Sequence, residues 1–250
     1  MDFSGQIIVR NLTVQFKQNI NRAESIKEHI LNTLGGKKSY RYFKALDNVS
    51  FAVKKGEVIG IIGSNGAGKS TLLKVIAGVI IPTSGTVFVR HKQVQLLTLG
   101  TGFDSELTAR ENVFLNGALI GYSKKFIQQK YDDIVKFSEL EGFMEHKVKN
   151  LSTGMVSRLG FAIATVGKAP EILILDEVLS VGDMFFRQKS SQHIKRLIHS
   201  GSTVLIVSHS TAVIRENCHK ALWLDKGRVM GFDSADLICS EYEKKGRALK

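Results

Sequence analysis

The chain has very little proline and cysteine, and it has no long hydrophobic run. Only two of its 250 residues are proline and two are cysteine, and it holds no internal repeat or low-complexity tract. Cys218 and Cys239 fit neither a metal-ligand spacing nor a disulfide framework, so we expect free thiols in a reducing cytoplasm. No apolar run approaches the roughly 18 residues that a membrane helix needs, and the stretch MDFSGQIIVR does not resemble a secretory signal. We therefore expect a globular protein without a membrane span or a signal peptide.

Positive charge is present in excess. The chain carries 35 Lys and Arg against 23 Asp and Glu, a net charge of +12. Such an excess is typical of proteins that meet nucleic acid, anionic lipid or phosphorylated ligands. It is concentrated between Lys17 and Lys44, with seven basic residues against two Glu. Charge alone does not separate a solvated basic face from a binding surface.

Hydrophobic patterning predicts an α/β fold. Strands are expected in IIVRNLTVQF, which ends at Phe16, in ALDNVSFAVKKGEVIGIIG, and in GTVFVRHKQVQLLTL. Between the first two, helical spacing of apolar residues predicts an amphipathic helix over 20–34, ended by Gly35-Gly36. Residues 106–169 are mostly helical in pattern. The runs EILILDE and STVLIVSH are apolar throughout, which is typical of strands buried on both faces of a parallel sheet.

A glycine-rich loop follows the strand EVIGIIG and leads into a helix. It matches the pattern G-x-x-x-x-G-K-[ST] in the strand–loop–helix setting that this motif requires. In this motif backbone N–H groups surround phosphates, Lys69 reaches the β and γ oxygens, and Ser70 ligates Mg²⁺. The sequence therefore predicts a nucleoside triphosphate site formed by Gly63, Ser64, Asn65, Gly66, Ala67, Gly68, Lys69, Ser70 and Thr71.

Acidic residues end the buried run ILILDE. The carboxyl end of a parallel strand lies on the ligand side of its sheet. Downstream of a phosphate loop, Asp176 fits an Mg²⁺ ligand, and Glu177 fits the group that polarises a water for attack on the γ-phosphate. His209 ends the run STVLIVSH in the same way, although a lone histidine there is more often structural than functional.

The stretch NLSTGMVSRLGFAIA begins a helix in an unusual way. One capping residue, Ser152 or Thr153, is enough to start a helix, and Gly154 just inside the cap lowers helix stability. Small residues at this position leave backbone N–H groups uncovered. The pattern therefore predicts an anion site at the helix start.

The order of these motifs resembles that of the ATP-binding-cassette (ABC) ATPases over essentially the whole chain. The phosphate loop comes first, LSTGM follows 82 residues after Lys69, and then come Asp176-Glu177, SVGD and His209. The resemblance implies one ATPase domain over 1–250. It would have an α/β P-loop core of the RecA-like type, an N-terminal antiparallel β subdomain and a helical subdomain over about 104–165.

The resemblance also implies a head-to-tail dimer and assigns roles within it. Ser152 and Gly154 would cap the γ-phosphate held by the loop of a second copy, and His209 would contact the same phosphate. Asp183 of SVGD would lie at the dimer seam. Phe16 is the first choice for an aromatic stacked on adenine, with three rivals: Tyr40, Tyr42 and Phe43. Any of the four could instead be a core residue.

Further segments resemble the exporters of lipid-linked polysaccharides such as O-antigen and teichoic acid. They are LGTGFDSELTARENVFLNGALIGYSKK, FSELEGF and EVLSVGD, with Leu99 where most ABC ATPases have glutamine. Thr98, Leu151 and Thr153 depart from that branch. The resemblance implies an ATPase that uses ATP and Mg²⁺ on the cytoplasmic face of the bacterial inner membrane, with a separate permease as partner. The helix over 20–34 would lie near the membrane entrance, and we expect no carbohydrate-binding domain after His209.

A soluble ABC ATPase that acts on nucleic acid or the ribosome is the alternative, and the net charge of +12 favours it. Translation factors of this family carry two cassettes in one chain, and repair proteins carry long coiled coils. Neither fits 250 residues without sustained heptads. A small-molecule P-loop kinase would leave LSTGM and His209 unexplained. We therefore expect no nucleic-acid partner.

Overall fold

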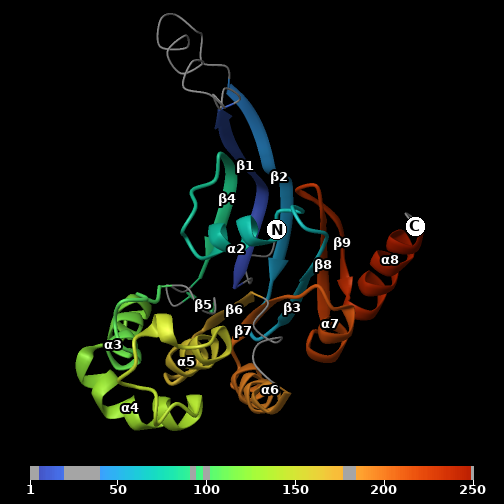
Figure 1. Ribbon diagram of the computed structural model, residues 1–250. Coiled ribbons are helices and arrows are strands. Elements are labelled where there is room, and N and C mark those ends of the chain that lie inside the picture. Colours follow the sequence, from blue (N-terminus) through green and yellow to red (C-terminus); the bar gives the residue numbers. More distant parts are fainter. Residues whose placement is uncertain (1–5, 20–39, 91–93, 98–101, 177–183, 249–250) are drawn as a thin grey trace, which may run out of the picture.

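The computed structural model describes residues 6–19, 40–90, 94–97, 102–176 and 184–248 (Figure 1). Several predicted features lie outside the described residues. They are the amphipathic helix over 20–34, the positions Thr98 and Leu99, the candidate base Glu177, and Asp183 in SVGD.

A three-stranded antiparallel sheet has the order β2-β1-β4, with β1 (Ile7–Asn19) between β2 (Tyr40–Val53) and β4 (Ser84–Val89). The prediction that the first strand ends at Phe16 is wrong, because β1 continues to Asn19 and β2 already begins at Tyr40. These outer ends pair with each other and project beyond β4 as a two-stranded ribbon (Figure 1). The described side chains of this ribbon are exposed, so no apolar alternation marks the strand there.

The main sheet has six strands in the order β5-β6-β7-β3-β8-β9. All neighbours are parallel except β8 and β9. Every residue of β3 and β7 is buried, and so is all of β6 except Asp176. The expected parallel strands buried on both faces are therefore confirmed. Their bounds are Val94–Leu97 (β5), Ile172–Asp176 (β6), Thr203–Val207 (β7), Val58–Ile62 (β3), Lys220–Asp225 (β8) and Arg228–Ser234 (β9).

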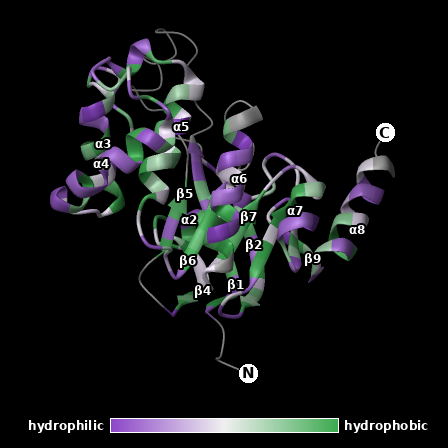
Figure 2. Cartoon of the chain, turned by 90° about the horizontal axis from the view of Figure 1, so that it is seen from below, coloured by the Kyte–Doolittle hydropathy of each residue, from purple (hydrophilic) through white to green (hydrophobic). Residues whose placement is uncertain are grey.

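Helices complete the layers on both faces of the main sheet. One core cluster joins the antiparallel sheet, α2 (Lys69–Ile76) and one face of the main sheet, through residues such as Leu46, Leu72 and Leu205. The opposite face packs against α6 (Met184–His199), α7 (Thr211–Asn217) and α8 (Ala235–Ala248). Figure 2 shows hydrophobic residues gathered in the central strands. The carboxyl ends of β3, β6 and β7 thus share one edge of a rigid sheet.

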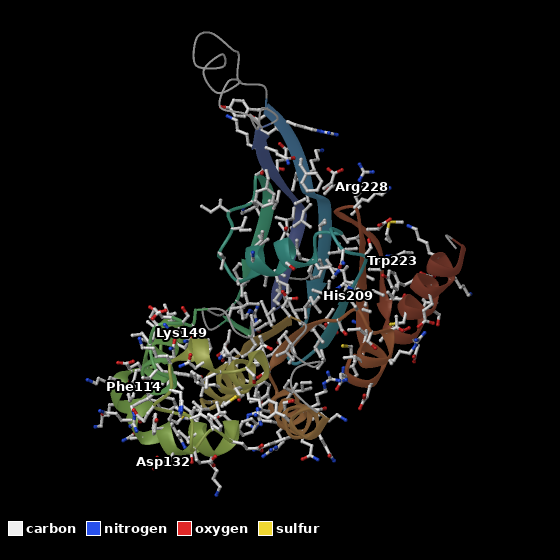
Figure 3. The ribbon with its side chains drawn as sticks, viewed as in Figure 1. Phe114, Asp132, Lys149, His209, Trp223 and Arg228 are labelled. Carbon is white, nitrogen blue, oxygen red and sulfur yellow. The ribbon has the colours of Figure 1, made fainter. Side chains whose placement is uncertain are left out.

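A separate group of helices forms between β5 and β6. It consists of α3 (Ala109–Ile120), α4 (Lys124–Ser138), a 3-10 turn η1 (Val148–Asn150) and α5 (Thr153–Thr165), and it has its own apolar core. α3 begins in a capping box of Thr108 and Glu111. Phe114, Asp132 and Lys149 of this group lie well away from His209 (Figure 3). Within the described part of the chain, no helix has both the length and the apolar character to cross a bilayer.

Candidate functional site

The loop between β3 and α2 is held tightly against β2. Gly68 caps α2 with a φ of +101°, and a Cβ atom there would lie 2.5 Å from the carbonyl oxygen of Ala45, so only glycine fits. The buried Lys69 donates from Nζ to the carbonyl oxygens of Gly63, at 2.7 Å, and Ser64, at 3.0 Å. The ammonium group and the amino-terminal end of α2 thus lie together. Both favour an anion.

A cleft of about 290 Å³ opens beside this loop. Three parts of the chain form it: the paired strands β1 and β2, the phosphate loop with the start of α2, and the turn after β7. The lining residues are Phe16, Phe43, Ala45, Asn65, Gly66, Ala67, Gly68, Lys69, Ser70, Thr71 and His209. The structure therefore brings His209 to the loop from 140 residues further along the sequence (209 − 69).

Strand register decides which aromatic side chains face the cleft. Phe16 and Phe43 are directly paired across β1 and β2, so their side chains lie on the same face of the ribbon. Tyr42 pairs with Lys17, one position along both strands, so both lie on the other face. There the Lys17 ammonium lies 3.6 Å from the centroid of the Tyr40 ring. The alternative that these aromatics are core is wrong, because each is at least 40% exposed.

Ala45 is a lining residue that sequence reasoning missed. It carries no polar group and belongs to no motif. Its place follows from its position in β2 and from the close approach of its carbonyl oxygen to Gly68. No signal in the sequence could have marked it.

The acid at the end of β6 lies at the same sheet edge but outside the cleft lining. Asp176 is in register with Val207 of β7, and it is partly exposed. Because β7 separates β6 from β3, Asp176 is two strands away from the strand that carries the loop. Among the described residues, no three His, Cys, Asp or Glu side chains gather into a metal-binding group. A cation held by Ser70 and Asp176 would therefore complete its shell with water and phosphate oxygens, as Mg²⁺ commonly does.

The unusual helix start lies on α5, in the helical group. Ser152 is its N-cap, and its Oγ accepts a hydrogen bond from the Met155 N–H at 3.2 Å. Among the described residues, a Cβ atom on Gly154 would meet only the Ser152 Oγ, at 3.8 Å, so packing against them does not require glycine there. None of the described residues that line the cleft belongs to α5. Gly154 is partly exposed, so its surface is accessible to a group from outside the chain.

Comparison with known proteins agrees with this geometry. Residues 46–180 match the family model described as ABC transporter. The chain is 42% identical over 204 residues to an O-antigen export system ATP-binding protein of Klebsiella pneumoniae, covering 82% of each chain. It is 36% identical over 240 residues to a teichoic acids export ATP-binding protein of Staphylococcus epidermidis, covering 96% of this chain and 89% of that protein.

The fold is also that of solved cassettes. A dimeric ATP-binding cassette in a post-hydrolysis state, bound to ADP and Pi, superposes with a TM-score of 0.71 at 25% identity, over 92% of this chain and 98% of that one. The chain therefore belongs to the ABC transporter family and is one of its ATPase cassettes.

Proposed function

We propose that this chain is the ATPase subunit of a polysaccharide exporter. It works as a homodimer at the cytoplasmic face of the bacterial inner membrane, bound to a separate permease that moves a lipid-linked glycan of the O-antigen or teichoic-acid type. The ATPase part rests on one observation, the cleft that unites Lys69, Ser70 and His209. The glycan part rests on similarity to proteins named as O-antigen and teichoic acid exporters over 82% to 96% of this chain.

Nucleotide binding uses the loop, the helix end and the ribbon. The loop N–H groups and the Lys69 ammonium hold the phosphates, with support from the positive end of the α2 dipole. The rings of Phe16 and Phe43, which line the cleft, stack on the adenine base. The phosphates and the base thus contact elements that pack rigidly on each other through the Gly68 and Ala45 contact.

Hydrolysis needs a water, a base and a stabiliser of the developing charge. Ser70 and Asp176 would hold Mg²⁺, which would supply positive charge beside the phosphate oxygens. Glu177 accepts a proton from the water as the water oxygen bonds to the γ-phosphorus and the bond to the ADP oxygen breaks. His209 donates a hydrogen bond to a γ-phosphate oxygen and stabilises charge in the transition state.

The second copy completes each site. Ser152 and the backbone at Gly154 bind the γ-phosphate held by the partner, so hydrolysis requires two chains arranged head to tail. The partial exposure of Gly154 and the open space beside its Cα support this role. The dimeric state of the similar solved cassette supports it as well. Asp183, outside the described residues, would lie at the seam between the copies.

The base is tested by Glu177→Gln. We expect turnover to fall by a factor of at least ~10², because the amide cannot accept the proton. ATP binding and ATP-dependent dimerisation, followed by equilibrium binding and size exclusion, should be retained. Glu171→Gln, at the exposed start of the segment that forms β6, is the matched control and should hydrolyse ATP normally. Near-normal hydrolysis by Glu177→Gln would contradict the assignment.

The transport role is tested by isolating the tagged chain from its own host in mild detergent. We expect a polytopic membrane protein to co-purify, and ATPase activity of the complex to rise when extracted lipid-linked glycan is added. Binding to DNA or RNA that weakens as salt increases would instead favour the nucleic-acid alternative.

A further inference from the structure

Helix α7 connects the cleft to the carboxyl-terminal helix. It begins two residues after His209 and has only seven residues, too few for a stable isolated helix. Its position is therefore set by the elements it packs on. On one side the buried Ile214 lies so close to β3 that a Cβ atom at Gly60 would be 2.5 Å from Ile214 Cγ2. α7 thus packs directly on the strand that leads into the phosphate loop.

The other side of α7 is held by one carboxylate of α8. Thr211 and Arg215 are four residues apart, so they lie on the same face of α7. Glu243 Oε1 accepts hydrogen bonds from the Thr211 hydroxyl and from Arg215 Nη1, the latter at 2.7 Å, and Oε2 accepts from Arg215 Nη2 at 3.2 Å. The hydrogen bond from Arg215 to Glu243 raises the pKa of the guanidinium. A single side chain therefore fixes both the first turn and the second turn of α7.

Neighbouring contacts extend this connection along α8. Arg215 Nη2 also donates to Ser240 Oγ at 3.2 Å, and Arg215 Nε lies 3.6 Å from an Asp236 carboxylate oxygen. The Cys239 thiol contacts the Thr211 carbonyl oxygen at 3.8 Å. α8 is itself anchored, because Ile238 and Cys239 are buried in the core cluster. The contacts to α7 thus come from a helix that is fixed to the main sheet.

We infer that Glu243 is a positioning residue for His209. The imidazole lies in the turn between β7 and α7, so β7 fixes one end of that turn and α7 fixes the other. By holding Thr211 and Arg215, Glu243 fixes α7 and with it the reach of His209 toward the γ-phosphate. The inference rests on the role of His209 in the proposed function.

Position, rather than stability, is the expected consequence of this contact. The Arg215 and Glu243 side chains are 31% and 36% exposed, and ion pairs of this kind add little to the free energy of unfolding. A misplacement of about 1 Å in a catalytic group can lower a rate by about 10²-fold. Loss of Glu243 should therefore lower kcat without unfolding the protein.

The first experiment compares steady-state ATP hydrolysis by Glu243→Ala and Glu243→Gln with the unmodified chain. We expect Glu243→Ala to lower kcat by about 5- to 50-fold, with KM for ATP changed by less than about twofold. Glu243→Gln, which keeps an oxygen acceptor, should recover part of the rate. Lys245→Ala removes a different ion pair of α8, to Asp225, and should leave kcat unchanged. Thermal melting checks that each variant is folded.

The second experiment asks whether Glu243 acts through His209. Single-turnover hydrolysis, which measures very slow rates, is compared for His209→Ala with and without Glu243→Ala. We expect no further loss in the double variant, because the group that Glu243 positions is already gone. A further loss there, or a normal kcat for Glu243→Ala, would overturn the inference. If Glu243→Ala does not fold, Glu243→Gln takes its place in both experiments, with the same outcomes decisive. A normal rate for His209→Ala alone would overturn the proposed role of His209 instead.

Discussion

The pairing of Phe16 with Phe43 predicts which aromatic substitutions weaken ATP binding. Both rings line the cleft, whereas the strand register turns Tyr42 to the opposite face of the same ribbon. Phe16→Ala and Phe43→Ala should therefore weaken ATP binding, and Tyr42→Ala should not. Tyr42 is a matched control, because it is an aromatic residue next to Phe43 on the same exposed strand.

The size of the effect follows from stacking. Removal of an aromatic ring that stacks on a base costs about 1–3 kcal/mol, which weakens binding by about 5- to 150-fold. The two rings are 43% and 54% exposed, so their truncation leaves no core cavity. Their effect on the free energy of unfolding should be within about 0.5 kcal/mol, as for other surface positions.

Equilibrium binding of ATP measures the dissociation constant of each variant, with Glu177→Gln as the background so that the nucleotide is not consumed. The variant with both phenylalanines replaced should be the weakest binder, and GTP should be affected as ATP is, because a stacked ring contacts any purine face. If Phe16→Ala and Phe43→Ala both bind ATP within about twofold of the parent, the assignment of the cleft wall to the adenine is refuted. Weaker binding in Tyr42→Ala alone would show that the opposite face of the ribbon meets the nucleotide.

Three further predictions address other parts of the molecule. In a mixture of Ser152→Arg and Lys69→Ala chains, each heterodimer has both defects in one site and leaves the other site intact. The ATPase activity of the mixture should therefore exceed that of either homodimer. A mixture no more active than the homodimers would contradict independent composite sites. Burial raises the pKa of Cys218 from 9.0 to about 12, so the thiol ionises at lower pH in the unfolded chain than in the folded one. The free energy of unfolding, measured with urea, should therefore fall between about pH 9 and pH 12. The fall should be smaller in Cys218→Ala, which lacks the thiol. Glutamine substitution of the basic residues in and beside 20–34, outside the described residues, should spare basal ATPase activity and sharply lower glycan at the cell surface. These residues are Arg22, Lys27, Lys37 and Lys38. Unchanged export would show that their charge is dispensable.

Features built from neighbouring residues could be predicted from the sequence. The phosphate loop is nine consecutive residues whose glycines serve local backbone needs, and its strand and helix adjoin it directly. Strands β6 and β7 were recognisable because burial on both faces requires an unbroken apolar run. The start of α5 carried its own cap signal at Ser152. In each case the determining forces act within a few residues.

The ends of other strands could not be predicted, because the forces that decide them act between residues far apart in the sequence. The outer ends of β1 and β2 form through pairing with each other, so their exposed side chains carry no pattern. Strands β2 and β3 are only a few residues apart in the sequence, yet they belong to different sheets. Only the pairing partners of each strand decide to which sheet it belongs.

By itself, the sequence was enough to predict a nucleoside triphosphate site at the P-loop, because that site is made by contiguous backbone. The tertiary structure alone decided the rest of the cleft. Register placed Phe43 beside Phe16 and turned Tyr42 away, and sheet order brought His209 to the loop. Packing of α8 on α7 joined Thr211 to Glu243, 32 residues later. Pairing and burial act between residues far apart in the chain, and a linear pattern does not record which distant residues they bring together.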